Sequence, residues 1–206
     1  MPDLKEIIER RRSVRDFLDE PVPEEDIDEM IRLATWAASA TNRQMWKFIV
    51  IYNQEIKDRM AEAVIDKIEH LADEYNVTEG VEGRRYFSAF FNRAPAVIVV
   101  LHEPYHIARW LKAELDWSDE KKTRLSAQPG LQSIGGAVQI LLLAAEAMGY
   151  GACWMTAPVI AAPELEEILG VEPPWELAAV IPVGKPAKVP GPKSRKPWEE
   201  TVKYIK

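Results

Sequence analysis

The chain has 206 residues, of which 47% are hydrophobic, so it can form one domain with a sizeable core, or one subunit of an intertwined dimer. Its net charge of −7 argues against nucleic acid or an anionic membrane as the main partner. The single cysteine, Cys153, excludes an intramolecular disulfide framework and a zinc cage of several thiolates.

The first quarter of the chain predicts two helices, a loop and a strand. Apolar residues at 4–8 share one side of a short first helix. A second helix is expected to begin near Pro23, because proline and acidic residues suit a first turn. Small polar residues at 37–43 then break the helical period, which indicates a loop. Residues 46–52 are β-branched and aromatic, which favours a strand.

The middle of the chain continues with mixed patterns. Apolar residues recur at helical spacing over 56–71 and again, as aromatic side chains, over 86–91. We expect the aromatic stripe to face the core or an interface, with stacking on a ligand as the alternative. Residues 95–101 are apolar almost throughout, which is typical of a central strand covered on both faces. A moderately amphipathic helix over 105–115 and a charged loop through 116–124 are expected next.

The longest apolar stretch covers residues 131–151, and Gln132, Gln139 and Glu146 interrupt it. Its apolar residues lie on nearly every face, which indicates a buried central helix rather than a membrane span. The elements expected after it are a short strand at 151–155, a helix near 163–169 and a strand at 177–183.

The end of the chain differs from the rest in its proline content. Residues 185–206 hold four prolines and cannot form a compact unit alone, so we expect this segment to run extended, over another subunit. Helices and strands mix over 1–184, which predicts a single α+β domain around a small sheet. No Gly-x-Gly-x-x-Gly follows a strand and no Gly-Lys-Ser/Thr loop occurs, so neither a Rossmann site nor a phosphate loop is expected.

Two small basic clusters lie near opposite ends of this acidic chain. Residues 11–15 read Arg-Arg-Ser-Val-Arg, and residues 193–195 read Lys-Ser-Arg. Arginine forks, an amine and serine hydroxyls suit a phosphate and a planar, oxygen-rich ring. If the fold brings the two ends together, they would hold a phosphorylated small molecule. The alternatives are a solvated C-terminal helix turn for the first cluster, favoured by the helix dipole, and a surface tail for the second.

Other chemically active residues give weaker signals. His102 and His106 have the i,i+4 spacing of a metal pair, but Pro104 breaks the helix that would align them, so we expect no metal site. Cys153 lies in an apolar strand and is interpreted as inert packing. Residues 1–6 are charged and lack the apolar run of a secretory leader, so a cytoplasmic protein is expected.

Four segments, taken in order, resemble the FMN-dependent nitroreductase family over residues 7–197. They are 11–15, 38–46 (Ala-Ser-Ala-Thr-Asn-Arg-Gln-Met-Trp), 149–156 (Gly-Tyr-Gly-Ala-Cys-Trp-Met-Thr) and 193–195. The resemblance implies a three-layer α+β sandwich with a small mixed sheet and an intertwined homodimer with two FMN molecules at its interface. It also implies that residues 185–206 form an arm that wraps the partner subunit.

The resemblance assigns the basic clusters to the FMN phosphate. Arg11 and Arg195 would pair with the phosphate, with Lys193 close by. Arg12 and Ser13 would contact the ribityl chain and the phosphate.

The remaining cofactor contacts implied by the resemblance concern the flavin ring. Arg15 would approach the pyrimidine edge, where a cation stabilises the negative charge of reduced flavin. The other implied contacts are Ser39, Ala40, Asn42 and Gln44 from the partner subunit, and backbone groups of Trp154, Met155 and Thr156 near N5.

The chain departs from the family pattern at one position. The second motif usually has proline between the glutamine and the tryptophan, and Met45 stands there instead. Methionine does not fix φ as proline does, so the loop beside the flavin is expected to be looser or differently shaped. This departure concerns substrate preference more than FMN binding.

By the resemblance, hydride passes from NADH or NADPH to flavin N5 and then to a nitroaromatic, a quinone or a related small acceptor, in a ping-pong scheme. No catalytic side chain is required, because the flavin carries the chemistry. One alternative is a reductive dehalogenase such as iodotyrosine deiodinase, whose branch the 11–15 motif followed by Pro21-Val22-Pro23 resembles. Another is a flavin-binding protein without turnover, and the last is an interaction scaffold without a chromophore. Residues 70–130 should shape the mouth of the pocket.

Overall fold

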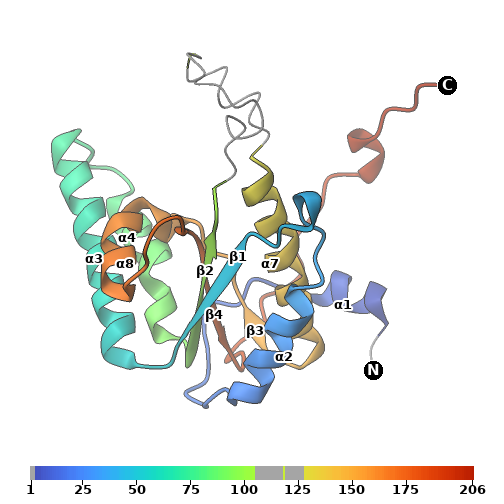
Figure 1. Cartoon of the computed structure of the whole chain (residues 1–206), viewed down its shortest axis with the longest axis horizontal. Coiled ribbons are helices and arrows are strands. Elements are labelled where there is room, and N and C mark those ends of the chain that lie inside the picture. Colours follow the sequence, from blue (N-terminus) through green and yellow to red (C-terminus); the bar gives the residue numbers. More distant parts are fainter. Residues whose placement is uncertain (1–2, 105–117, 119–127) are drawn as a thin grey trace.

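The computed structural model describes residues 3–104, 118 and 128–206, which form three layers (Figure 1). The middle layer is a four-stranded sheet in the order β1-β2-β4-β3. Its strands are β1 (Trp46–Ile51), β2 (Ala96–His102), β3 (Gly151–Ala152) and β4 (Glu176–Gly184). One face is covered by α3 (Gln54–Glu74), α4 (Val81–Ala89) and α8 (Ala162–Leu169), and the other by α2 (Glu24–Ala34) and α7 (Pro129–Ala147). The three-layer α+β prediction is confirmed.

Strand β2 divides the core into two halves, because its side chains alternate between the sheet faces. Ile98 and Val100 point toward α2 and α7, whereas Val97 and Val99 point toward α3 and α8. All of β2 is buried, as the apolar run in the sequence predicted. This buried sheet is the rigid frame on which the candidate site rests.

The direction of the strands corrects one prediction. The sheet was expected to be mixed, but each ladder between the described strands is antiparallel. Between β1 and β2 the chain runs out along α3 and back along α4, so β2 starts from the end of the sheet at which β1 finished (Figure 1). The parallel pairing found within the described residues is an isolated bridge between Ser13 and Ala152.

Helix α7 is the one described helix that is long and apolar enough to cross a membrane, judged by length and composition alone. It packs instead against α2 and the sheet, with Ala137, Val138 and Leu141 fully buried. The predicted helix is therefore confirmed, with α7 beginning at Pro129, but only its face toward α2 and the sheet is buried, whereas Leu131, Gln132 and Gln139 are exposed.

The aromatic stripe at 86–91 divides between core and surface. Phe90 and Phe91 are buried, while Tyr86 and Phe87 are about half exposed. The reason is that α4 ends at Ala89 and a 3-10 turn, η2 (Phe90–Arg93), follows, so the helical period does not continue. The helix expected over 105–115, and His106 within it, lie outside the described residues, as does nearly all of the charged loop.

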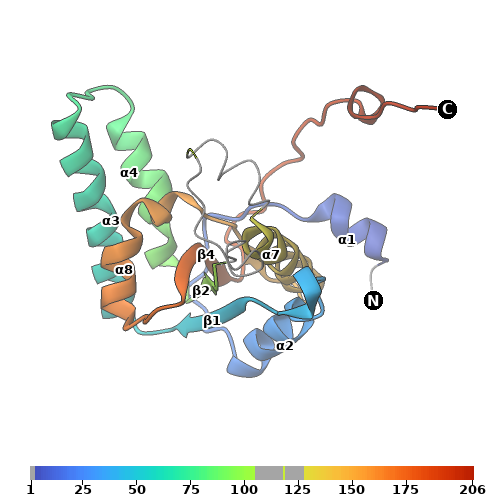
Figure 2. The same cartoon turned by 45° about the horizontal axis from the view of Figure 1, so that its top comes forward.

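The two ends of the chain extend away from the sandwich on the same side (Figure 2). Helix α1 (Leu4–Arg10) lies beside the C-terminal part of α7, where Arg10 forms an ion pair with Glu146. After β4 the chain runs extended, apart from a single 3-10 turn, η4 (Trp198–Thr201), and its residues 191–206 are exposed.

Candidate functional site

The first basic cluster is fixed against the edge strand β3. Val14 is buried, its amide donates to the carbonyl of Ala152 at 3.1 Å, and Ser13 bridges the same residue. Gly151 makes this contact possible, because a Cβ there would lie 2.6–2.8 Å from the side chain of Val14. The motif Arg-Arg-Ser-Val-Arg therefore runs along β3, and the buried valine holds it there with polar residues on either side.

The start of the C-terminal segment pairs with the residues that follow this motif. The amide of Leu18 donates to the carbonyl of Lys185 at 2.9 Å, and the amide of Ala187 donates to the carbonyl of Asp16 at 3.0 Å. The two ends of the domain thus meet, although Lys193 and Arg195 lie farther along the exposed arm. The described contacts of the Arg195 guanidinium are local, to the carbonyls of Lys193 and Ser194.

Arg12 turns back onto the helix that precedes it. Its Nη1 donates to the carbonyls of Glu9, Arg10 and Arg11 at 2.7–3.0 Å. A cation on the last carbonyls of a helix is favoured by the helix dipole. For Arg12, the alternative interpretation as a helix-terminal residue therefore matches the geometry.

Arg11, Ser13 and Arg15 gather around the buried thiol of Cys153. Burial raises the pKa of Cys153, and the positive charge of Arg15, a hydrogen bond with Ser13 and the charge of Arg11 oppose this shift. Arg11 and Arg15 are half-buried, and neither forms an ion pair with any carboxylate of the described chain. Two half-buried arginines without a described carboxylate partner make a cradle for an anion.

The loop that carries Ser39, Ala40, Asn42 and Gln44 has an unusual backbone. Thr41, Asn42 and Gln44 have φ values of 54°, 55° and 51°, a region that costs energy for residues other than glycine. The hydroxyl of Ser39 accepts from the amide of Gln44 at 3.0 Å, and the Gln44 amide group donates to Asn42 Oδ1 at 3.4 Å. Strain held in place by side chains is typical of functional loops.

Two anchors hold this loop to the sandwich. The amide of Ala40 donates to Ser133 Oγ on α7 at 3.3 Å, and Ser133 in turn donates to the carbonyl of Pro129. Met45, which stands where the family pattern has proline, is 1% exposed. Its carbonyl accepts from the amide of Glu103 at 3.2 Å. The buried side chain of Met45 and the hydrogen bond at its carbonyl hold the end of this loop against the sandwich.

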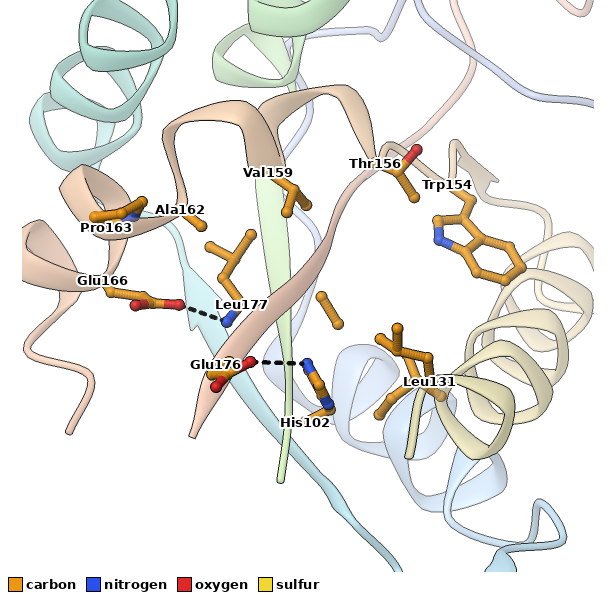
Figure 3. Close-up of a pocket in the computed structure, with 12 residues that line it drawn as sticks. His102, Leu131, Trp154, Thr156, Val159, Ala162, Pro163, Glu166, Glu176 and Leu177 are labelled. Atoms are coloured by element: carbon orange, nitrogen blue, oxygen red, sulfur yellow. Dashed lines mark hydrogen bonds and ion pairs between the residues drawn. The ribbon is translucent and has the colours of Figure 1, made fainter. Parts of the chain in front are cut away.

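The segment 154–156 forms the boundary between the basic cradle and a pocket. Cys153 faces the cradle, whereas Trp154 lies against α7, where a Cβ on Gly135 would be 3.5 Å from the indole. Met155 is buried and bridges Val180 of β4. Trp154 and Thr156 are exposed and face the pocket (Figure 3).

The pocket has a volume of about 690 Å³ and lies between the start of α7, the turn η3 (Ala157–Ala161) and α8. Apolar side chains dominate its wall, including Leu131, Ile134 and Leu177. His102 and Glu176, from the ends of β2 and β4, form its polar end (Figure 3).

The sequence prediction did not assign His102 and Glu176 to the site. His102 was considered only as a metal ligand, and no cluster of three or more potential metal ligands occurs in the described parts of the chain. Their ladder register brings them together, with Nε2 of His102 3.6 Å from a carboxylate oxygen of Glu176. The signal available in the sequence was one polar residue at the end of an otherwise apolar strand: His102 ends β2, and Glu176 begins β4.

Comparison with known proteins gives the family. The model of the nitroreductase family matches residues 8–185, and the chain belongs to this family. A BluB-like flavoprotein from Clostridium difficile 630 superposes with a TM-score of 0.86 over the full length of both chains, at 30% identity. A nitroreductase with bound FMN from Desulfitobacterium hafniense DCB-2 has the same fold, with a TM-score of 0.74, 21% identity and full coverage of both chains.

Curated relatives carry two kinds of name. The iodotyrosine deiodinase of Hydra vulgaris is 28% identical over 92% of this chain and 68% of its own length. A protein of Archaeoglobus fulgidus with the provisional name NADH dehydrogenase/NAD(P)H nitroreductase is 26% identical over 90% of this chain and 87% of its own length. These comparisons show the family of the chain, whereas the names of its relatives point to two different reactions.

Proposed function

We propose that the protein is an FMN-dependent oxidoreductase that passes hydride from NADH or NADPH to a small acceptor. The observation that carries this proposal is the cradle of Arg11, Ser13 and Arg15, fixed against β3 and without a described carboxylate partner. A phosphorylated, oxygen-rich cofactor is the ligand that such a cradle suits. Membership of a family in which a relative is called a flavoprotein supports the choice of FMN.

The residues present fit FMN. Arg11 and Ser13 would bind the phosphate, and Arg15 would lie at the pyrimidine edge of the ring. Arg12 would contribute through donors other than its Nη1, which holds the carbonyls of α1. Further contacts are proposed for Trp154, Met155 and Thr156 along the ring and, from a second subunit, for Ser39, Ala40, Asn42, Gln44, Lys193 and Arg195.

The chemistry that FMN supplies when bound is hydride transfer, from the nicotinamide and then to the acceptor in a second half-reaction. The protein positions the reactants and adjusts the charge around them. Arg15 stabilises negative charge at the ring edge, and Trp154 with the apolar wall of the pocket excludes water. We assign no side chain as a nucleophile.

We also propose a homodimer in which the arm, residues 185–206, lies on the partner subunit, with 1–184 as the domain. Large apolar side chains are exposed on the arm, namely Trp198 at 60%, Tyr204 at 73% and Ile205 at 88%, and just after α2, where Trp36 is 78% exposed. Exposed side chains of this size mark an interaction surface. A cytoplasmic location belongs to the same proposal, since the one thiol is buried and unpaired.

Anaerobic mixing tests the reaction. NADH or NADPH should bleach the visible absorbance of the bound flavin, and a quinone or nitroaromatic added afterwards should restore it. A bound flavin that both nicotinamides leave oxidised would contradict the proposal and favour a flavin-binding protein without turnover.

A second candidate is a reductive dehalogenase, favoured by the similarity to the Hydra vulgaris iodotyrosine deiodinase. By the resemblance, that branch grips its zwitterionic substrate with an acid, a tyrosine and a lysine on a lid. These would come from residues 69–122, of which 105–117 and 119–122 lie outside the described residues. Saturable binding of 3-iodotyrosine to the oxidised protein, with iodide release on reduction, would favour this candidate. Weak, non-saturable binding would exclude it.

A further inference from the structure

The root of the arm, residues 185–187, is paired with the segment that follows the basic cradle. Residues 16–18 and 185–187 run side by side, joined by two backbone hydrogen bonds of 2.9 and 3.0 Å and by an isolated antiparallel bridge. Residues 191–206 are exposed, and the arm leads away from the sandwich (Figure 2). The direction in which the arm leaves the domain is therefore set at its root.

The side chain of Lys185 ties this root to a third segment. Its Nζ lies 3.8 Å from the centre of the Tyr150 ring, which is the geometry of a cation–π interaction. Tyr150 lies between α7 and β3 and is only 6% exposed, so the ring is held in place by its surroundings. Within the described part of the chain, the ammonium of Lys185 forms no salt bridge. The ring of Tyr150 is therefore the contact that positions this ammonium.

The other end of Tyr150 is fixed on α2. Its hydroxyl donates to the carboxylate of Asp26 at 2.5 Å. Burial raises the pKa of Tyr150 to about 12, and the hydrogen bond to Asp26 and the charge of Asp26 act in the same direction. The phenol therefore keeps its proton at physiological pH and remains a donor. A phenol that donates to a carboxylate is polarised toward a more electron-rich ring, which attracts the ammonium of Lys185 more strongly.

The cluster of Asp26, Tyr150 and Lys185 connects segments that carry proposed flavin contacts. Helix α2, which holds Asp26, leads into the loop at 39–44, and Tyr150 leads through β3 to residues 154–156. Lys185 begins the arm that carries Arg195. The loop and the arm of one subunit are both proposed to reach the flavin of the other. The cluster therefore fixes the place from which the arm starts relative to the loop.

We propose that Lys185 is a positioning residue for the FMN site, because its ammonium over Tyr150 fixes the direction of the arm and so brings Arg195 to the phosphate of the flavin on the partner subunit. The inference rests on the proposed function and adds a residue to it. Lys185 acts through Arg195 and not through contact with the flavin. Its removal should therefore weaken FMN binding less than the removal of Arg195 does.

Amide hydrogen exchange of the full chain tests the contact itself. Lys185→Met keeps the aliphatic stem and removes the ammonium, so the amides of Leu18 and Ala187 should exchange about two- to fivefold faster, the effect of one cation–π contact at a partly exposed site. Lys185→Arg keeps a cation over the ring and should restore the wild-type rates. Lys188→Met, at an exposed position on the arm, removes the same charge and is the matched control. It should leave both amides unchanged.

Titration with two flavins tests the link to the phosphate. Lys185→Met should weaken FMN binding about two- to fivefold and leave riboflavin binding unchanged, because riboflavin has no phosphate. A general loss of folding would weaken the binding of both flavins. Lys188→Met should change neither affinity. Addition of Lys185→Met to Arg195→Ala should cause no further loss of FMN affinity, since the two residues act in one chain of contacts.

Three results would overturn the inference. They are exchange rates and FMN affinities of Lys185→Met that equal those of Lys188→Met, equal losses for FMN and riboflavin, and failure of Lys185→Arg to restore the wild-type values. If the wild type binds FMN and Arg195→Ala weakens that binding, any of these results would remove the role of Lys185 and leave the proposed function intact. A wild type that binds no flavin would overturn the proposed function and the inference with it.

Discussion

Gly151 controls the position of the basic cradle. Its missing side chain lets Val14 approach β3, and a Cβ would lie 2.6–2.8 Å from three atoms of that valine. Gly151→Ala should therefore lower the free energy of unfolding by about 1–3 kcal/mol, the usual cost of overpacking, and weaken FMN binding because Arg15 shifts with Val14.

Gly83→Ala is the control for this prediction. Gly83 lies in α4 with nothing within 4 Å of an added Cβ, so the change should stabilise the protein by about 0.5–1 kcal/mol. Urea denaturation measures both variants. Equal stability of the two would contradict the assignment of Gly151 as the residue that admits Val14.

His102 makes stability depend on pH. Burial lowers its pKa in the folded protein, against Glu176 and Glu166, so the unfolded chain binds a proton more readily. The stability that neutral His102 contributes is complete above the ordinary histidine pKa of about 6.5 and is lost as pH falls toward the folded value. Between pH 7 and pH 5, the free energy of unfolding should fall more for wild type than for His102→Phe. Parallel pH profiles of the two proteins would contradict this.

At the scale of elements, α7 supports the strained loop at 39–44. Ser133 accepts a hydrogen bond from the amide of Ala40 and donates to Pro129, and it is 5% exposed. Ser133→Ala should cost about 0.5–1.5 kcal/mol and speed amide hydrogen exchange across the loop, since two backbone groups lose their partner.

Thr201→Ala removes a hydroxyl that bonds within the exposed turn η4, and it is the matched control. It should leave exchange at 39–44 unchanged. Unaltered exchange in the loop of Ser133→Ala would show that α7 does not hold it.

Elements with a strong local pattern could be predicted from the sequence. The apolar run at 95–101 became β2, which is buried throughout, and the long stretch from 131 became α7, whose face toward α2 and the sheet is buried. The expected strand at 151–155 has two ladder residues, Gly151 and Ala152, and an isolated bridge from Met155 to Val180 of β4, because the side chain of Trp154 between them turns to α7. Such a departure depends on tertiary contacts that no local pattern encodes.

The candidate site was predictable where residue types alone carry the signal. The arginines at 11–15 indicated an anion site from their sequence. Their position beside Cys153, the return of Arg12 to the carbonyls of α1, and the pairing of His102 with Glu176 depend on contacts between residues far apart or on backbone geometry. Met45 was expected to loosen its loop, and this stays a prediction, although the side chain of Met45 is buried.

At the scale of the whole molecule, the two basic clusters are proposed to meet only in a dimer. The described contacts of Arg195 are within the arm, whereas Arg11 bonds to α1 and acts on Cys153. Arg11→Ala and Arg195→Ala should each weaken FMN binding about ten- to a hundredfold, as loss of a charge-assisted contact to phosphate does, and change riboflavin binding little.

Arg32→Ala is the control, since Arg32 pairs with Glu29 on the exposed face of α2. Fluorescence titration with the two flavins measures the affinities. Equal losses for FMN and riboflavin would mean that neither arginine binds the phosphate.

The central claim is that this chain carries FMN, and the most direct measurement uses the protein purified without added flavin. Its visible spectrum is recorded, and any chromophore is then released and identified by mass spectrometry. The account predicts the two visible absorption bands of an oxidised flavin and released FMN. A colourless protein that also fails to bind added FMN would contradict it, and the basic clusters would then be a helix terminus and a surface tail.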